Sequence, residues 1–241
     1  MRKFAIFVEG QTELIFVREF LLKKFAFSVN IECRTLFSDG QFNSAEYDFL
    51  NSSSQLLFQI INVGNDNAVI SKMLKREDCL WSQGFEAIVC LRDMYSKDYR
   101  DISMIVDSSV IDRFINGAKD SLSKAKRPKD IDFIFAIMEV EAWFLGHCTL
   151  FQSLDSRLTP KFILEQLKID LEKIDPESSI FHPAKVVDDI YQTIGKRYDK
   201  HKRDIEKISS VFTIADFETL YSMPKCKTFN EFVDSLDRRI A

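Results

Sequence analysis

The sequence predicts an α/β protein with a mostly parallel sheet flanked by helices and a helical C-terminal part. Up to about residue 150, short apolar runs alternate with segments of helical periodicity, the pattern of parallel strands joined by helices. From residue 159 to residue 241 only helical periodicity remains. The 46% hydrophobic content, with only 7 Gly and 5 Pro in 241 residues, excludes a disordered chain. We therefore expect an α/β domain at residues 1–150 and a helical extension at residues 151–241 packed on it.

The first predicted strand covers residues 3–8, an apolar run that ends at Glu9. Apolar residues then recur at helical spacing to about residue 24, and Thr12 is the expected N-cap of this helix. Turn residues such as Asp39-Gly40 punctuate the next segment. Further strands are expected near 31–37 and at 56–63, 85–91 and 132–138, and further helices at about 68–81 and 110–125.

Composition excludes several functional classes. No apolar run approaches the roughly 20 residues of a membrane helix, and the N-terminus does not read as a signal peptide. The five cysteines are scattered and form no Cys-x-x-Cys pair, which argues against a disulfide framework and a structural zinc site. We expect a cytoplasmic protein. The net charge of −4 is weak evidence about partners, because binding depends on where the charges lie.

Acidic residues follow three of the predicted strands. Glu9 comes after the first, Asp93 after the strand at 85–91, and Glu139 and Glu141 after the strand at 132–138. Parallel sheets bind ligands at the carboxyl ends of their strands, so these acids can converge there. Several close carboxylates need a counter-charge, and oxygen ligands without Cys or His select Mg²⁺, Mn²⁺ or Ca²⁺. Each acid taken alone is also explained by a helix cap or a surface loop.

These segments resemble the motifs of Toprim domains, which occur in type IA and type II topoisomerases, bacterial primases and OLD-type nucleases. The first segment, V-E-G-Q-T-E, looks most like the nuclease branch. The glutamate segment with its Glu-Ala-Trp-hydrophobic pattern resembles small stand-alone bacterial Toprim-like proteins associated with OLD and anti-phage nucleases. The matching segments are 8–13, 61–64, 91–93 and 139–145, and more loosely 182–185 and 195–200.

The resemblance implies a Toprim-like (Rossmann-like) fold and a nuclease that uses Mg²⁺ or Mn²⁺ to hydrolyse phosphodiester bonds of DNA or RNA, in anti-phage defence or a toxin-like role. One departure is that Tyr95 stands where the family has the second Asp of its Asp-x-Asp motif, which puts a second metal in doubt; Asp98 is a possible substitute. The expected metal ligands are Glu9, Glu13, Asp93, Glu139 and Glu141, with Glu139 and Glu141 competing if a helix begins there.

Catalytic roles are expected for Glu9, Glu13, Asp93, Lys196 and Lys200. The two lysines would supply charge for the phosphate, and they share a face if their segment is helical. An exposed helix face with internal ion pairs explains the same lysines structurally. The chain has no Walker motif, so any ATPase activity would belong to a separate partner protein.

Two alternatives remain open. One is a non-catalytic Toprim-like subunit that binds nucleic acid or a partner ATPase, which Tyr95 favours. The other is a phosphohydrolase or nucleotidyltransferase that acts on small phosphates through the same carboxylates.

Overall fold

The computed structural model describes residues 1–36, 42–43, 46–64 and 68–241. The Asp39-Gly40 turn and the last residue of the strand predicted at 31–37 lie outside this range. The chain forms two compact units, and each unit is made of more than one segment of the chain. The sheet unit comprises Met1–Arg92, Asp112–Phe135 and Glu231–Ala241, and the helical unit comprises Asp93–Ile111 and Ala136–Asn230.

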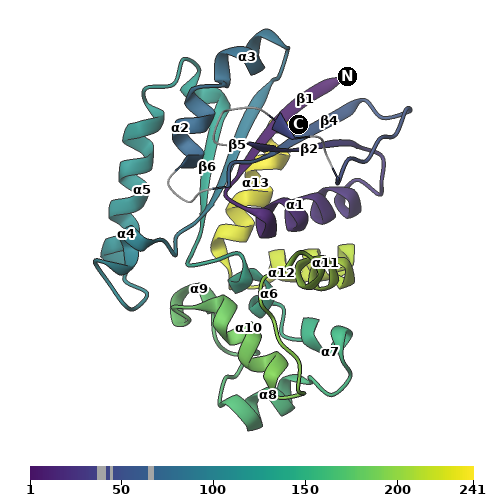
Figure 1. The fold of residues 1–241 in the computed structure, drawn as a ribbon, viewed down its shortest axis with the longest axis vertical. Helices are drawn as coiled ribbons and strands as arrows, with labels where there is room; N and C mark the ends of the chain where they lie inside the picture. The colour runs from purple at the N-terminus through teal and green to yellow at the C-terminus, as the bar shows by residue number, and fades with distance from the viewer. Residues whose placement is uncertain (37–41, 44–45, 65–67) are drawn as a thin grey trace. The chain divides into compact units, whose positions relative to one another are not determined.

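The sheet unit confirms the predicted α/β class. Within the described residues, its strands follow the order β3-β2-β4-β1-β5-β6; all of them except β3 are labelled in Figure 1. Five run parallel, and the short β3 is antiparallel to β2. Strands β1, β4 and β5 come from apolar runs, which suit a parallel sheet that is covered on both faces. The strand bounds are β1 Arg2–Val8, β2 Asn30–Leu36, β3 Phe42–Asn43, β4 Leu56–Asn62, β5 Ala87–Asp93 and β6 Ile131–Ala136.

Helices cover both faces of this sheet. Residues of α2 (Val69–Leu74), α3 (Glu77–Ser82) and α5 (Ser108–Leu122) pack with one face in a continuous apolar cluster. Helices α1 (Gln11–Lys24) and α13 (Lys227–Ile240) belong to the other face, where the rings of Phe20 and Phe232 lie 6.0 Å apart. A 3-10 turn at Pro128–Asp130 leads into β6.

Two local expectations were wrong. Helix α1 begins at Gln11 with Gly10 as its N-cap, and Thr12 lies inside the helix. The capping comes from Glu13, whose carboxylate accepts the Gly10 N–H at 2.7 Å. The single helix expected at 68–81 is two short helices, α2 and α3, which are separated at Lys75 and Arg76.

The helical unit is built around α6 (Glu141–Gly146), in which every residue is buried. Its ring contacts include Trp143 with Phe229 at 5.4 Å and Phe144 with Phe212 at 6.1 Å. A short helix that is buried on all sides belongs in the middle of a core. The other helices are α4 Lys97–Arg100, α7 Leu150–Leu154, α8 Pro160–Leu167, α9 Pro176–Ser179, α10 Pro183–Gln192, α11 Lys202–Val211 and α12 Ile214–Ser222.

The C-terminal part is helical, as predicted, and no strand occurs after β6 in residues 137–241, all of which the structure describes. Among the residues that the structure describes, no helix combines the length and the apolar character that a membrane crossing requires.

Candidate metal centre

The backbone aligns the ends of β5 and β6 beyond the last sheet residues. The Met94 N–H donates to Ala136 O at 2.9 Å, and the Tyr95 N–H donates to Met138 O at 2.7 Å. These bonds continue the pairing of the two strands after Asp93, the last residue of β5. The acids at the ends of the two strands therefore lie close together, as expected for strands that end at one edge of a sheet.

A sharp turn then directs two glutamates inward. Met138 has φ +61°, a left-handed conformation that costs energy for a residue with a side chain and that recurs at functional sites. Helix α6 begins at Glu141, so Glu139 precedes it in the turn. The expectation that only one glutamate would point inward if a helix began here was wrong, because the turn at Met138 brings in Glu139 as well.

Three carboxylates converge in this place. One oxygen from each of Asp93, Glu139 and Glu141 lies within 4.8 Å of the others. All three residues are buried, with exposed fractions of 6%, 4% and 0%. Asp93 Oδ1 also accepts the Val140 N–H at 3.0 Å, which fixes the turn that carries the glutamates.

A lysine ammonium lies between two of these carboxylates. Lys200 Nζ is 2.8 Å from Glu139 Oε1 and 3.2 Å from Glu141 Oε1. Burial opposes its charge, but the charges of Glu141, Glu139 and Asp93 outweigh this and raise the pKa of Lys200 above its usual value. Lys200 has φ +55°, so a second strained backbone position serves the cluster.

Further neighbours hydrogen-bond to the two glutamates. Glu139 Oε2 accepts the Ala184 N–H at 2.9 Å and lies 3.2 Å from His182 Nδ1. Burial disfavours the Glu139 carboxylate, but hydrogen bonds from His182 and Lys200 and the Lys200 charge lower its pKa to about 2. Glu141 Oε1 accepts the Tyr198 O–H at 2.8 Å. Burial and the charge of Glu141 raise the pKa of Tyr198 well above its usual value, so it remains a donor.

The donor set fits a hard divalent cation, since all three side chains offer oxygen. Three ionised carboxylates and the one ammonium leave two net negative charges, which is the charge that one Mg²⁺ or Mn²⁺ would neutralise. Asp93, Glu139 and Glu141 are the side chains that would hold it.

Other predicted site residues lie elsewhere. Lys196 Nζ pairs with Asp155 at 2.8 Å, and its segment after Gly195 is not helical, so the condition under which Lys196 and Lys200 would share a helix face is not met. Asp98 is exposed on α4 and is not among the converging acids.

Glu9 and Glu13 belong to the sheet unit. Glu9 follows β1 and is half-buried. Glu13 is buried in α1, where its carboxylate caps the helix. Metal ligation by these two glutamates stays a prediction from the resemblance.

Two residues at the cluster were not expected to take part. No site role was assigned to His182 or Tyr198 from the sequence. Their partners Glu139 and Glu141 are 43 and 57 residues away in the sequence, and no local periodicity reports such contacts. The one sequence feature that pointed to them was the expected likeness of segments 182–185 and 195–200 to small stand-alone Toprim-like proteins, since His182 and Tyr198 lie in these segments.

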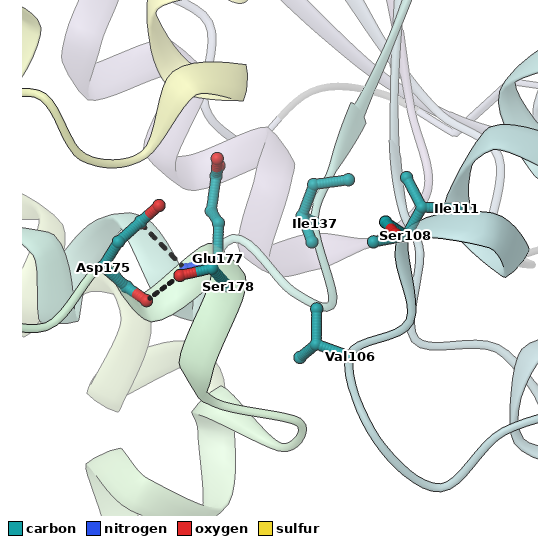
Figure 2. A pocket seen from close by; sticks show the side chains of 7 residues that line it. All are labelled: Val106, Ser108, Ile111, Ile137, Asp175, Glu177 and Ser178. Carbon is teal, nitrogen blue, oxygen red and sulfur yellow. Dashed lines mark hydrogen bonds between the residues drawn. The ribbon is translucent and has the colours of Figure 1, made fainter.

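A cavity in the helical unit is less suited to chemistry than the carboxylate cluster. It has a volume of about 280 Å³, and Figure 2 shows the side chains that line it. Its acids already have structural partners, since Asp175 caps α9 and Glu177 accepts the Trp143 indole N–H at 2.9 Å. Seven side chains line it: Val106, Ser108, Ile111, Ile137, Asp175, Glu177 and Ser178.

A comparison with known protein families places the chain. The model of a family described as "Domain of unknown function (DUF4276)" matches residues 8–237. No curated protein and no solved structure matches the chain. Since the match covers nearly the whole chain, the protein belongs to the DUF4276 family.

Proposed function

We propose that the cluster of Asp93, Glu139 and Glu141 binds one divalent cation and that the protein is a metal-dependent nuclease. The observation that carries the proposal is the convergence of three buried carboxylates, with ligand oxygens within 4.8 Å of one another, around the ammonium of Lys200. A bound Mg²⁺ or Mn²⁺ would supply an activated water and charge neutralisation for hydrolysis of a phosphodiester bond.

The protein's own groups have complementary tasks in this proposal. Tyr198 and His182 orient Glu141 and Glu139 by hydrogen bonding, as outer partners do in metal sites. Lys200 places a positive charge beside the carboxylates, where it can stabilise the charge that develops on a phosphate. The likeness of segments 8–13 and 91–93 to Toprim nucleases supports nucleic acid as the substrate, and Glu9 and Glu13 as further ligands. It also supports a role in anti-phage defence, with a separate ATPase as a possible partner protein.

One observation favours a different function. Lys200 already supplies a cation to the acids, so the cluster can be stable as a metal-free ion network in a non-catalytic subunit that binds nucleic acid or a partner protein. Calorimetric titration with Mn²⁺ separates the two. The nuclease proposal expects one ion per chain, with affinity lost in Glu141→Gln and Asp93→Asn.

The activity is tested by incubating single-stranded DNA, duplex DNA and RNA with the protein and Mg²⁺ or Mn²⁺. We expect cleavage that EDTA abolishes and that falls by at least about 100-fold in Glu141→Gln, as for removal of a group that acts on the transition state. Glu172→Gln is the matched control, because Glu172 is an exposed acid of the same unit. Undiminished cleavage by Glu141→Gln, or no metal-dependent cleavage of any substrate, would contradict the proposal.

A further inference from the structure

Tyr95, which replaces an acid of the Toprim pattern, takes part in a group of rings beside the carboxylates. Its ring lies 4.5 Å from the ring of His182, at an interplanar angle of 32°. Phe181 packs edge-on against Tyr95 at 5.3 Å. His182 in turn contacts Glu139 through Nδ1. The rings are therefore connected directly to the acid cluster.

A guanidinium extends this group. Arg100 Cζ lies 4.9 Å from the centre of the Tyr95 ring, within the range of a cation–π contact. Arg100 and Lys97 are both exposed on α4. We call Arg100, Tyr95 and His182 the stacking column. All of its members belong to the helical unit.

The column is held in place at two points. The Tyr95 N–H donates to Met138 O at 2.7 Å, which ties it to the strained turn before Glu139. The His182 ring is held by Glu139, yet 42% of its side-chain surface is exposed. Exposed ring surface that is fixed in position can receive another flat group at low entropic cost.

Unpaired nucleobases are the flat groups that such surfaces bind. Bases of single strands stack on aromatic rings and guanidinium planes, and nearby cations contact the backbone phosphates. Bases inside a duplex are stacked on one another and do not offer a free face. A base on the column would bring its adjoining phosphate towards Asp93, Glu139 and Glu141.

We propose that the stacking column binds an unpaired base, so that the substrate of this site is single-stranded nucleic acid. The inference rests on the proposed function, in which the acids act on a phosphodiester bond. It also gives Tyr95 a task that an aspartate could not perform, since its ring contacts both the His182 ring and the Arg100 guanidinium and so joins the members of the column.

The test measures binding in EDTA, where cleavage does not occur. Fluorescence anisotropy would follow a labelled oligothymidylate, its oligouridylate counterpart and a duplex of equal length. We expect tighter binding of single strands than of the duplex, and a loss of at least about fivefold in Tyr95→Ala, the lower range for one base stack. Tyr95→Phe, which keeps the ring, should bind like wild type. Tyr221→Ala, at a tyrosine 43% exposed on α12, is the matched control.

Tyr95 is half-buried, so its replacement can disturb folding. Arg100 is exposed, and Arg100→Ala therefore gives a second test without that risk. It should also weaken single-strand binding. Equal binding by wild type, Tyr95→Ala and Arg100→Ala, or tighter binding of the duplex, would overturn the column. The preferred oligonucleotide distinguishes DNA from RNA.

The experiments can reject the stacking column and the nuclease proposal independently of each other. Single-strand binding through Tyr95 without cleavage in Mn²⁺ would keep the column and reject the nuclease. Metal-dependent cleavage of single strands at an unchanged KM and kcat in Tyr95→Ala would keep the nuclease and reject the column.

Discussion

At the scale of single residues, Lys200 supplies a positive charge that stabilises the acid cluster without a metal. Its ammonium contacts Glu139 and Glu141 at 2.8 and 3.2 Å. We predict that Lys200→Met lowers the free energy of unfolding in EDTA by about 1–3 kcal/mol. This is less than the loss for a fully buried pair, because 36% of the Lys200 side chain is exposed. Thermal unfolding in EDTA measures the change.

The same variant should respond more strongly to metal. A cation stabilises the folded state in proportion to its affinity for that state, and in Lys200→Met the carboxylates lose the positive charge of the Lys200 ammonium. The rise in Tm on adding Mn²⁺ should therefore be larger in Lys200→Met than in wild type. Lys185→Met is the control, because Lys185 pairs with Asp189 at the surface. Equal rises in wild type and Lys200→Met would mean that the metal and the lysine do not share these carboxylates.

A second buried acid, Glu177, makes stability depend on pH. Burial raises its pKa from 4.5 to about 7, although hydrogen bonds from Thr228 and Trp143 offset part of the effect. Between these pKa values the unfolded state loses its proton while the folded state keeps it, so stability falls as pH rises. We predict a loss on the order of 3 kcal/mol between about pH 4.5 and pH 7.

Glu177→Gln isolates this contribution. The variant cannot ionise at this position, so its urea-unfolding free energy should lack that part of the decline, and between about pH 4.5 and pH 7 the difference between the two proteins should shift by about 3 kcal/mol in favour of the variant. The amide also faces the Thr228 N–H, which costs the variant some stability at every pH. Parallel curves for the two proteins would show that Glu177 does not titrate in this window.

At the scale of elements, the sequence predicts what local periodicity controls. The runs that form β1, β4 and β5 are apolar because the parallel sheet buries them on both sides. The break at Lys75 and Arg76 could not be predicted, since no Gly or Pro marks it. The charges of the segment at Lys196–Lys200 have helical spacing and suggest a helix, yet its residues have tertiary partners instead.

Helix α6 tolerates little change where it meets Cys226. A Cβ on Gly146 would overlap Cys226 Sγ and lie 3.0 Å from Leu220 Cδ1. Cys226 and Leu220 are both fully buried and cannot move aside easily. We predict that Gly146→Ala destabilises the protein by about 1–3 kcal/mol, the usual cost of overpacking, measured by urea unfolding.

Gly117 provides the matched control, since it lies in α5 and a Cβ added there would have no described atom of another residue within 4 Å beyond its own helical turn. Gly117→Ala should be neutral or stabilising by up to about 1 kcal/mol, because alanine favours helix. Similar losses in both variants would show that Gly146 is not tightly packed.

At the scale of the whole molecule, the sequence could not predict which distant segments of the chain come together in each unit. The carboxyl ends of β5 and β6 carry the acids, as the strand pattern predicted. However, Lys200, His182 and Tyr198 come from segments far along the chain, and only folding brings them to those acids. The sequence also placed a boundary near residue 150. In the structure the sheet unit includes Glu231–Ala241, and the helical unit includes Asp93–Ile111.

Because the C-terminal residues belong to the sheet unit, we can predict how the protein responds to truncation. Arg239 and Ser235 of α13 bind Asp132 of β6 at 2.7 and 2.9 Å, and Phe232 packs against Phe20. A fragment of residues 1–150 loses all of these contacts and also most of the helical unit. We expect it to lack cooperative thermal unfolding and amide protection in β6, and to regain both when residues 151–241 are supplied as a second chain. Deletion of residues 231–241 alone should destabilise β6 more than β4. A fragment 1–150 that unfolds cooperatively at the Tm of the full chain would show that the sheet is complete without α13.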